Sequence, residues 1–111
     1  MKIIIVRDKI TKDGLIELAR EFYVEMVKGV ADIDREIIAL GGEWHIDSNN
    51  VLIEDGSKQS SLWGFNVYLD KKIEYTSLIN IRPLQNNKNL EIEDDEIRDK
   101  IRVILQEMIE W

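Results

Sequence analysis

The chain has 111 residues, of which 44% are hydrophobic and 33% are charged, a balance typical of one compact soluble domain. Its 22 acidic and 15 basic residues give a net charge of −7, the wrong sign for a protein that binds the phosphates of nucleic acids. Because the chain has no cysteine, disulfides, thiolate nucleophiles and cysteine-bound metals are excluded.

The N-terminal stretch predicts a strand rather than a membrane span or a signal peptide. Its strictly apolar run, Ile3 to Val6, is far shorter than the ~20 residues that cross a bilayer. Arg7, Asp8 and Lys9 interrupt the run, and no small-residue cleavage site follows. Four consecutive β-branched residues are typical of a strand covered on both faces. We therefore expect a strand inside the sheet of a cytoplasmic protein.

Residues 12–40 predict one long helix. After Thr11, a candidate N-cap, apolar residues recur in steps of three and four up to Leu40, and two glycines then end the pattern. The pattern predicts a helix of ~28 residues, with a break at Gly29 as the alternative. A helix of this length extends beyond its sheet, so its projecting apolar stripe invites a partner.

Residues 43–54 predict a β-hairpin. A two-residue turn at Asn49-Asn50 sets Ile46 opposite Ile53, and asparagine tolerates the positive φ that such a turn requires. A three-residue turn would instead set Ile53 opposite His45 and mix the two faces of the hairpin. We therefore expect the two-residue turn.

Residues 62–82 predict a second hairpin. Strand alternation places Trp63, Phe65 and Val67 on the core face of the sheet together with Ile79. We interpret Gly64 as a β-bulge, which would change the faces on one side of it; the alternative is a close approach of another backbone or a ligand at this glycine.

The last third of the chain predicts a loop and a helix capped by Asp94 or Asp95. The buried stripe of this helix contains Ile97, Ile101, Ile104, Leu105 and Met108. The fold class is therefore α+β: a single domain over residues 1–111 with an N-terminal strand, a long helix, four mainly antiparallel strands in two hairpins, and a C-terminal helix packed on one sheet face.

The other face of the predicted sheet mixes apolar, amide and charged side chains. A solvated face would carry more lysine, glutamate and threonine, so this mixture favours a ligand site or a subunit interface. The residues assigned to this second face are His45, Asp47, Leu52, Glu54, Leu62, Gly64, Asn66, Tyr68, Leu78, Asn80 and Arg82.

Five residues on or beside this face are candidate binding residues: His45, Ser57, Asn66, Asn80 and Arg82. The guanidinium of Arg82 would address an anion held against the loop of residues 55–60. The alternative is an ion pair of Arg82 with Glu54 or Asp55. Asn80 is open to a second interpretation, as a hydrogen-bonded amide at a sheet edge.

No complete catalytic or metal-binding set is predicted. Glu43, His45 and Asp47 would share one strand face as three candidate metal ligands, but a cross-strand pair of His45 with Glu54 explains the histidine without a metal. Ser57 lacks the strand-to-helix turn that activates a serine nucleophile. We expect no cofactor, and no nucleotide-binding fingerprint occurs.

Three segments carry a resemblance to a known family: "EFYVEMVKGVADIDREIIALGGEWHID", "EDGSKQSSLWGFNVY" and "EYTSLINIRP". On these segments the chain resembles a family of small, uncharacterised prokaryotic proteins known only as a domain of unknown function. The resemblance covers most of the chain. It implies a freestanding domain and no reaction, cofactor, partner or functional residue.

Two hypotheses of function follow. The first is a cytoplasmic binding or protein-interaction domain that forms a homodimer through the mixed sheet face or the long helix, with a small anionic ligand or a basic protein as further candidate partners and neither nucleic acid nor membrane among them. The alternative is a small enzyme that acts on an anionic metabolite, with Arg82 binding the anion and His45 transferring protons.

Overall fold

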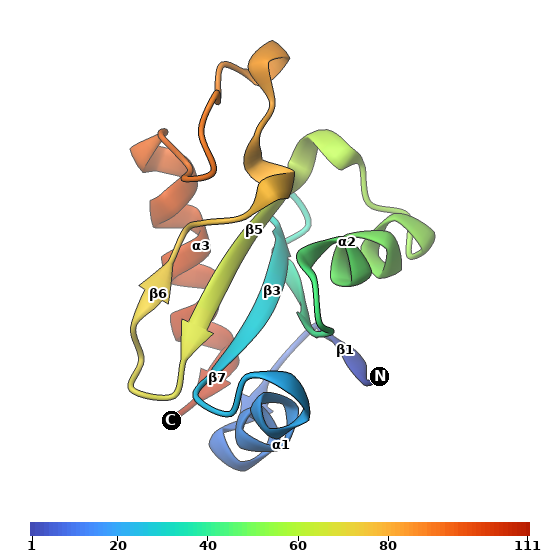
Figure 1. Cartoon of the computed structure of the whole chain (residues 1–111), viewed down its shortest axis with the longest axis vertical. Coiled ribbons are helices and arrows are strands. Elements are labelled where there is room, and N and C mark those ends of the chain that lie inside the picture. Colours follow the sequence, from blue (N-terminus) through green and yellow to red (C-terminus); the bar gives the residue numbers. More distant parts are fainter.

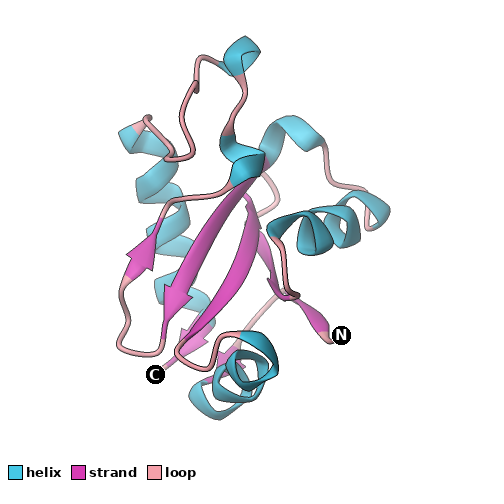
Figure 2. Ribbon diagram, in the orientation of Figure 1, coloured by secondary structure: helices cyan, strands magenta, loops and turns pink.

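A five-stranded antiparallel sheet organises the chain, and a computed structural model describes all of residues 1–111 (Figures 1 and 2). The strands lie in the order β1-β4-β3-β5-β6, and each neighbouring pair is antiparallel. Their bounds are β1 Ile3–Val6, β3 Met26–Asp32, β4 Ile37–Gly41, β5 Leu62–Tyr68 and β6 Ile73–Glu74. A separate parallel ladder joins β2 Ile10–Thr11 to β7 Ile109–Glu110.

Helices cover both faces of this sheet. The helices are α1 Lys12–Phe22, α2 His45–Glu54 and α3 Asp95–Met108, and the short 3-10 turns are η1 Gln59–Ser61, η2 Leu78–Asn80 and η3 Pro83–Gln85. Figure 1 shows α2 and α3 on opposite sides of the sheet. The α+β class and the C-terminal helix on one sheet face are therefore confirmed. No helix is long and apolar enough to cross a lipid bilayer.

The alternation of β5 divides the interior into two cores. Trp63, Phe65 and Val67 join the larger cluster, which includes the buried stripes of α1 and α3. Leu62 joins a smaller cluster with Leu52 of α2 on the opposite face.

The pairing of β5 with β3 runs without interruption over seven residue pairs, so the expected bulge at Gly64 is wrong. A Cβ there would lie 2.5 Å from that of Ser77, which is the close approach named as the alternative.

The predicted helix over residues 12–40 is wrong, because only its first third is helical. The helix α1 ends at Phe22, and Val24 then adopts a left-handed φ of 66° that turns the chain into β3. A strand buried on both faces has a nearly continuous apolar sequence, which periodicity alone does not separate from a buried helix. The central position that we expected for the first strand belongs to β3, and β1 lies at the sheet edge with β4 as its only neighbour.

The predicted hairpin over residues 43–54 is also wrong, because this segment forms α2. The carboxylate of Asp47 accepts a hydrogen bond from the Trp44 N–H at 3.0 Å and caps the helix start. The buried face of α2 follows helical spacing but is mostly polar, since it contains His45, Ser48, Asn49 and Leu52. A helix that buries polar side chains has no apolar stripe, so the hydrophobic pattern concealed it.

The predicted strand over residues 73–82 ends after Glu74, and a side chain then takes over its hydrogen bonds. Asn80 is fully buried. Its Oδ1 accepts from the Gly64 N–H at 2.8 Å, and its Nδ2 donates to the Gly64 carbonyl at 3.0 Å. The turn of η2 packs Ile79 against the smaller cluster, on the face opposite Trp63, so the predicted shared face of Trp63 and Ile79 is wrong.

We expect Asn80→Ala to lower the free energy of unfolding by about 2–4 kcal/mol, because it leaves a buried backbone N–H and carbonyl of Gly64 without their partners. Urea denaturation followed by circular dichroism measures this change. Asn50→Ala, at an exposed amide on α2, serves as the control and should change stability by less than about 0.5 kcal/mol. Equal effects of the two substitutions would contradict the bracing role of Asn80.

Candidate functional site

A groove of about 410 Å³ opens on the second face of the sheet, between the start of α2 and the η2 segment. We call it the second-face groove. Its lining includes four exposed apolar side chains, Trp44, Ile46, Leu78 and Leu90, which we call its walls. It also includes the less exposed Lys28, His45 and Asn66, which we call its floor. The wall residues are unusually open to solvent, since Trp44 is 59% and Leu78 is 75% exposed. Exposed apolar walls around a polar floor are typical of a binding site.

The imidazole of His45 is buried beneath the walls of the groove. Its Nε2 lies 2.9 Å from the Phe65 carbonyl oxygen, and because a carbonyl only accepts, Nε2 carries the proton. Burial lowers the pKa of His45 from 6.5 to about 4; the nearby charge of Lys28 also lowers it, while the Phe65 bond and the Asn66 amide act in the opposite direction. His45 is therefore neutral at pH 7 and unsuited to proton transfer there.

Asn66 belongs to β5 and pairs with Lys28 of β3 on one side and with Glu74 of β6 on the other. Its Nδ2 donates to Glu74 Oε1 at 3.3 Å, but its buried Oδ1 has no hydrogen-bond partner. The ammonium of Lys28 lies 5.1 Å from the centre of the Tyr23 ring, and burial lowers the pKa of Lys28 although Glu74 raises it. The groove floor thus offers one unsatisfied acceptor and one cation.

Arg82 lies outside this groove and braces the backbone. Its Nε donates to the Ile79 carbonyl at 3.0 Å, and its Nη1 donates to the Gln59 carbonyl at 2.8 Å and to Gln85 Oε1 at 3.0 Å. Its Nη2 donates to the Leu62 carbonyl, and the guanidinium stacks 4.1 Å from the centre of the Trp63 ring. These bonds use four of the five guanidinium N–H donors on groups of the protein itself, and Arg82 forms no ion pair with Glu54 or Asp55, which was the alternative.

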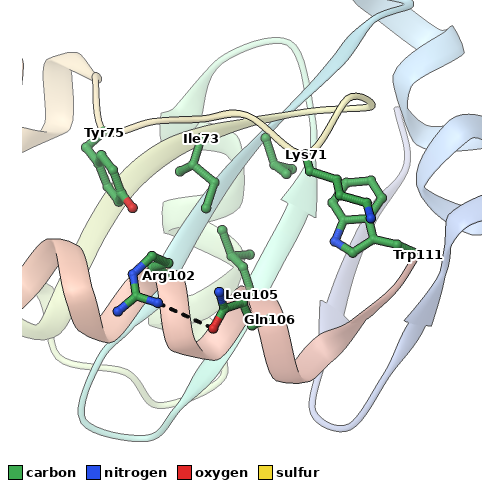
Figure 3. Close-up of a pocket in the computed structure, with 8 residues that line it drawn as sticks. Lys71, Ile73, Tyr75, Arg102, Leu105, Gln106 and Trp111 are labelled. Atoms are coloured by element: carbon green, nitrogen blue, oxygen red, sulfur yellow. Dashed lines mark hydrogen bonds between the residues drawn. The ribbon is translucent and has the colours of Figure 1, made fainter.

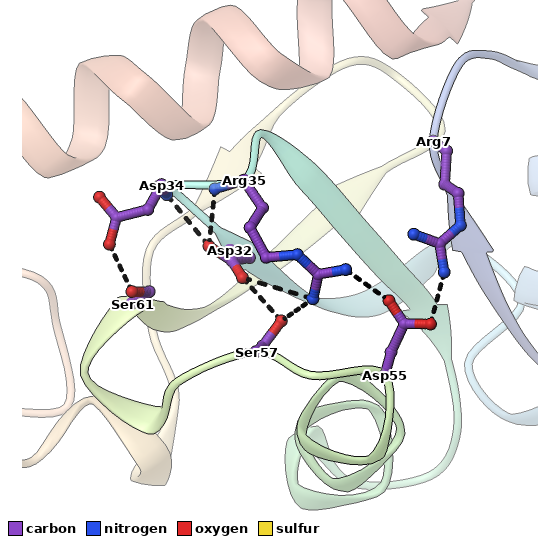
Figure 4. A network of polar contacts seen from close by, with 7 residues as sticks. All are labelled: Arg7, Asp32, Asp34, Arg35, Asp55, Ser57 and Ser61. Atoms are coloured by element: carbon purple, nitrogen blue, oxygen red, sulfur yellow. Dashed lines mark hydrogen bonds and ion pairs between the residues drawn. The ribbon is translucent and has the colours of Figure 1, made fainter.

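Ser57 belongs to a polar network at the end of α2 (Figure 4). Its Oγ donates to Asp32 Oδ2 at 2.6 Å and accepts from Arg35 Nη1 at 2.7 Å. Asp55 joins this network through Arg35 and Arg7, whose hydrogen bonds lower the pKa of Asp55, that of Arg7 most. The network ties the β3–β4 turn to α2 and β1, and no imidazole is available to activate Ser57.

The structure thus brings two of the five predicted binding residues together. His45 and Asn66 share the second-face groove, whereas Ser57, Asn80 and Arg82 hold separate parts of the fold. Glu43, His45 and Asp47 do not form the predicted row on one strand, because His45 and Asp47 belong to α2 and the Asp47 carboxylate caps it.

Sequence reasoning missed Lys28 and Trp44. Lys28 was placed on the predicted long helix, although the alternation around it matches a strand whose second face holds Lys28 and Val30. Trp44 precedes a helix that the apolar pattern did not reveal.

Comparison with known proteins identifies a family without an assigned activity. The family described as "Protein of unknown function (DUF5674)" matches residues 4–108. Searches of curated proteins and of solved structures found no match.

The groove floor makes the stability of the protein sensitive to pH. Above pH 6.5 His45 is neutral in both states and contributes no dependence; as pH falls from about 6.5 to about 4, the unfolded chain takes up a proton that the folded chain does not. We expect this residue to lower the free energy of unfolding by about 2 kcal/mol between pH 7 and pH 5. His45→Gln should lose that component in urea denaturation. His45 is the only histidine of the chain, so the imidazole NMR signals of the folded protein, followed against pH, give the pKa of His45 directly. A pKa near 6.5 in the folded protein would contradict this expectation.

Proposed function

The chain belongs to the DUF5674 family of proteins of unknown function, and we propose that it is an interaction domain that pairs with a second copy of itself through the second-face groove. The observation that carries this proposal is that one chain has both a groove with exposed apolar walls and a separate, fully exposed apolar projection. Leu78 and Leu90 line the groove, and Leu84, which lies between them in the sequence, is fully exposed.

Leu84 stands on η3 at the far end of the molecule (Figure 1). The segment is held firmly: Arg82 and Asn87 exchange two backbone hydrogen bonds at its base. The Asn87 side chain also donates to the carbonyls of Asn80, Asn89 and Glu91. A braced projection loses little conformational freedom when it binds, which favours association. Leu84 is therefore presented as a rigid apolar knob.

A two-fold dimer would use the knob and the groove twice. In such a dimer each copy inserts Leu84 into the groove of the other, so that the same patch serves both partners. Burial of one leucine side chain contributes about 1.5–3 kcal/mol, and the contact would also cover the exposed rings and methyl groups of the groove walls.

Charge also favours this place for contact between copies. The chain carries a net charge of −7, so two copies repel each other over most of their surfaces. No acidic side chain lines the groove, and its one charged residue is Lys28. The same feature argues against a basic protein partner at this site. The proposal retains the sequence-based expectation of a cytoplasmic location.

The alternative enzyme draws no support from the geometry. It requires His45 and Arg82 in one cleft, but the groove at His45 does not include Arg82, whose donors already bind backbone carbonyls. We do not propose it further.

We expect the wild-type protein to sediment as a dimer, and Leu84→Ser and Leu78→Ser each to weaken dimerisation by about 100-fold or more, since each substitution affects both copies of the contact. Analytical ultracentrifugation over a wide concentration range measures this. Val103→Ser is the control, because Val103 on α3 is also an exposed apolar side chain but does not line the groove.

Mixing the two variants tests the reciprocal arrangement. A dimer of Leu84→Ser with Leu78→Ser keeps one intact knob in one intact groove, whereas either variant alone keeps none. We expect the mixture to form more dimer than either variant. A wild-type protein that stays monomeric at all concentrations, or a dimer that both variants leave unchanged, would refute the proposal.

A further inference from the structure

A second pocket, of about 430 Å³, lies between the β5–β6 hairpin and α3 (Figure 3). We call it the hairpin pocket. Its apolar lining includes Val67 and Leu105, which belong to the larger core cluster. The pocket therefore opens on the face of the sheet opposite the second-face groove, and the two sites share no residue.

The hairpin pocket is positively charged in an acidic protein. Lys71 and Arg102 line it and no aspartate or glutamate does, although acidic residues outnumber basic ones by 22 to 15 in the chain. Figure 3 shows the two side chains approaching the pocket from opposite sides, one from the hairpin turn and one from α3. Two cations without a lining carboxylate create a local potential that attracts an anion.

Neither cation is firmly engaged within the protein. Arg102 forms an exposed ion pair with Asp99, whose Oδ1 lies 3.5 Å from Nη2, and its Nη1 lies 3.4 Å from Gln106 Oε1. Both contacts are at the limit of hydrogen bonding, and an exposed pair of this kind contributes little. Lys71 forms no ion pair, and its Nζ lies 5.9 Å from the centre of the Trp111 ring. Arg82, in contrast, makes three short bonds to backbone carbonyls. Lys71 and Arg102 therefore keep hydrogen-bond donors for a ligand, and the weak contact of Arg102 with Asp99 would be exchanged for a contact with the anion.

The backbone at Lys71 is an unusual place for a lysine. Its φ is 79°, in the left-handed region where glycine or asparagine is favoured, and a side chain there carries a strain of about 1 kcal/mol. The turn is closed by bonds from the Lys71 N–H to the Tyr68 carbonyl and from the Tyr68 N–H to the Lys72 carbonyl. The side chain of Lys71 thus lines the pocket although its backbone conformation is strained.

Aromatic rings complete the pocket. The phenol of Tyr75 and the indole of Trp111 stand at its two ends (Figure 3). Burial raises the pKa of Tyr75 although Arg102 and Arg98 lower it, so the phenol is a neutral hydrogen-bond donor at pH 7. The lining thus combines apolar surface, flat rings, one donor hydroxyl and two cations, which is the complement of a small amphipathic anion.

We propose that the hairpin pocket binds a small organic anion with a flat apolar body. The body lies on the apolar lining between Tyr75 and Trp111, and the acidic group pairs with Lys71 or Arg102. This site is independent of the proposed dimer contact, since Leu84 and the second-face groove lie elsewhere.

The test uses two probes with the same anilinonaphthalene body, 8-anilinonaphthalene-1-sulfonate and the neutral N-phenyl-1-naphthylamine, which lacks the charged sulfonate group. Titration followed by amide and indole NMR shifts gives both the affinity and the location of each probe. We expect the sulfonate to shift Lys71, Arg102 and the Trp111 indole and to bind more tightly than the neutral probe. Lys71→Gln with Arg102→Gln should weaken the sulfonate by about 10-fold or more and leave the neutral probe unchanged.

Two further variants separate binding from folding. Lys71→Gly removes the cation and relieves the backbone strain, so it should bind the sulfonate more weakly while its free energy of unfolding stays equal or rises. Lys72→Gln is the matched control, because Lys72 is the next residue of the turn but does not line the pocket. Its Nζ lies 5.7 Å from the centre of the Tyr68 ring instead. Its affinity for the sulfonate should match the wild type.

Four results would each overturn this inference: no sulfonate binding, equal affinities for the two probes, sulfonate binding that survives the double substitution, or sulfonate binding that maps away from the hairpin pocket. Failure of the dimer proposal would leave these results unaffected, since Leu84→Ser should not alter sulfonate affinity and the Lys71 and Arg102 variants should not alter sedimentation.

Discussion

The side-chain amide of Asn80 holds the second face of this protein together by standing in for a strand. On the outer edge of β5, β6 pairs only with the residues near Asn66 and Val67. Further along that edge, the Gly64 backbone bonds to the Asn80 amide and the Leu62 carbonyl bonds to Arg82. Buried backbone groups need partners, and side chains supply them here without a continuous strand. This leaves the chain free to turn through η2 and form one wall of the second-face groove.

The sequence predicted correctly those elements whose apolar pattern fits only one type of secondary structure. Strict alternation placed Trp63, Phe65 and Val67 in the core, and the widely spaced stripe of α3, capped by Asp94 through the Glu96 N–H, predicted the final helix. Residues 26–41 fill two adjacent strands of the sheet, one of them central and both largely buried, and their run of apolar residues fits a helix as well as a strand. The helix α2 was not predicted because its buried face is mostly polar, so it shows no apolar stripe at helical spacing.

The candidate site was predicted in part, and partly through the wrong elements. His45 and Asn66 were assigned to one face, and they do share a groove, although His45 reaches it from a helix instead of a hairpin. Asn80 and Arg82 drew attention because amides and guanidinium groups stand out beside apolar residues. In the structure both side chains bond to backbone groups instead, because an amide and a guanidinium each carry several donors that can satisfy otherwise unpaired carbonyls. Lys28 and Trp44 were not predicted as site residues because the secondary structure around them was predicted wrongly. The local sequence pattern also does not show which strands become neighbours in the sheet.

The parallel ladder of β2 and β7 joins residues that almost the whole chain separates, Ile10 with Ile109 and Thr11 with Glu110. A contact this distant in sequence closes a long loop of the chain, which costs conformational entropy. The ladder has only two residue pairs outside the main sheet, but Ile10 and Ile109 are buried in the larger cluster, so its opening by local unfolding requires both side chains to leave the core. Trp111, which follows β7 directly, forms one end of the hairpin pocket. Transient release of this ladder would therefore act as a gate, exposing or closing one wall of the pocket while the five-stranded sheet stays intact.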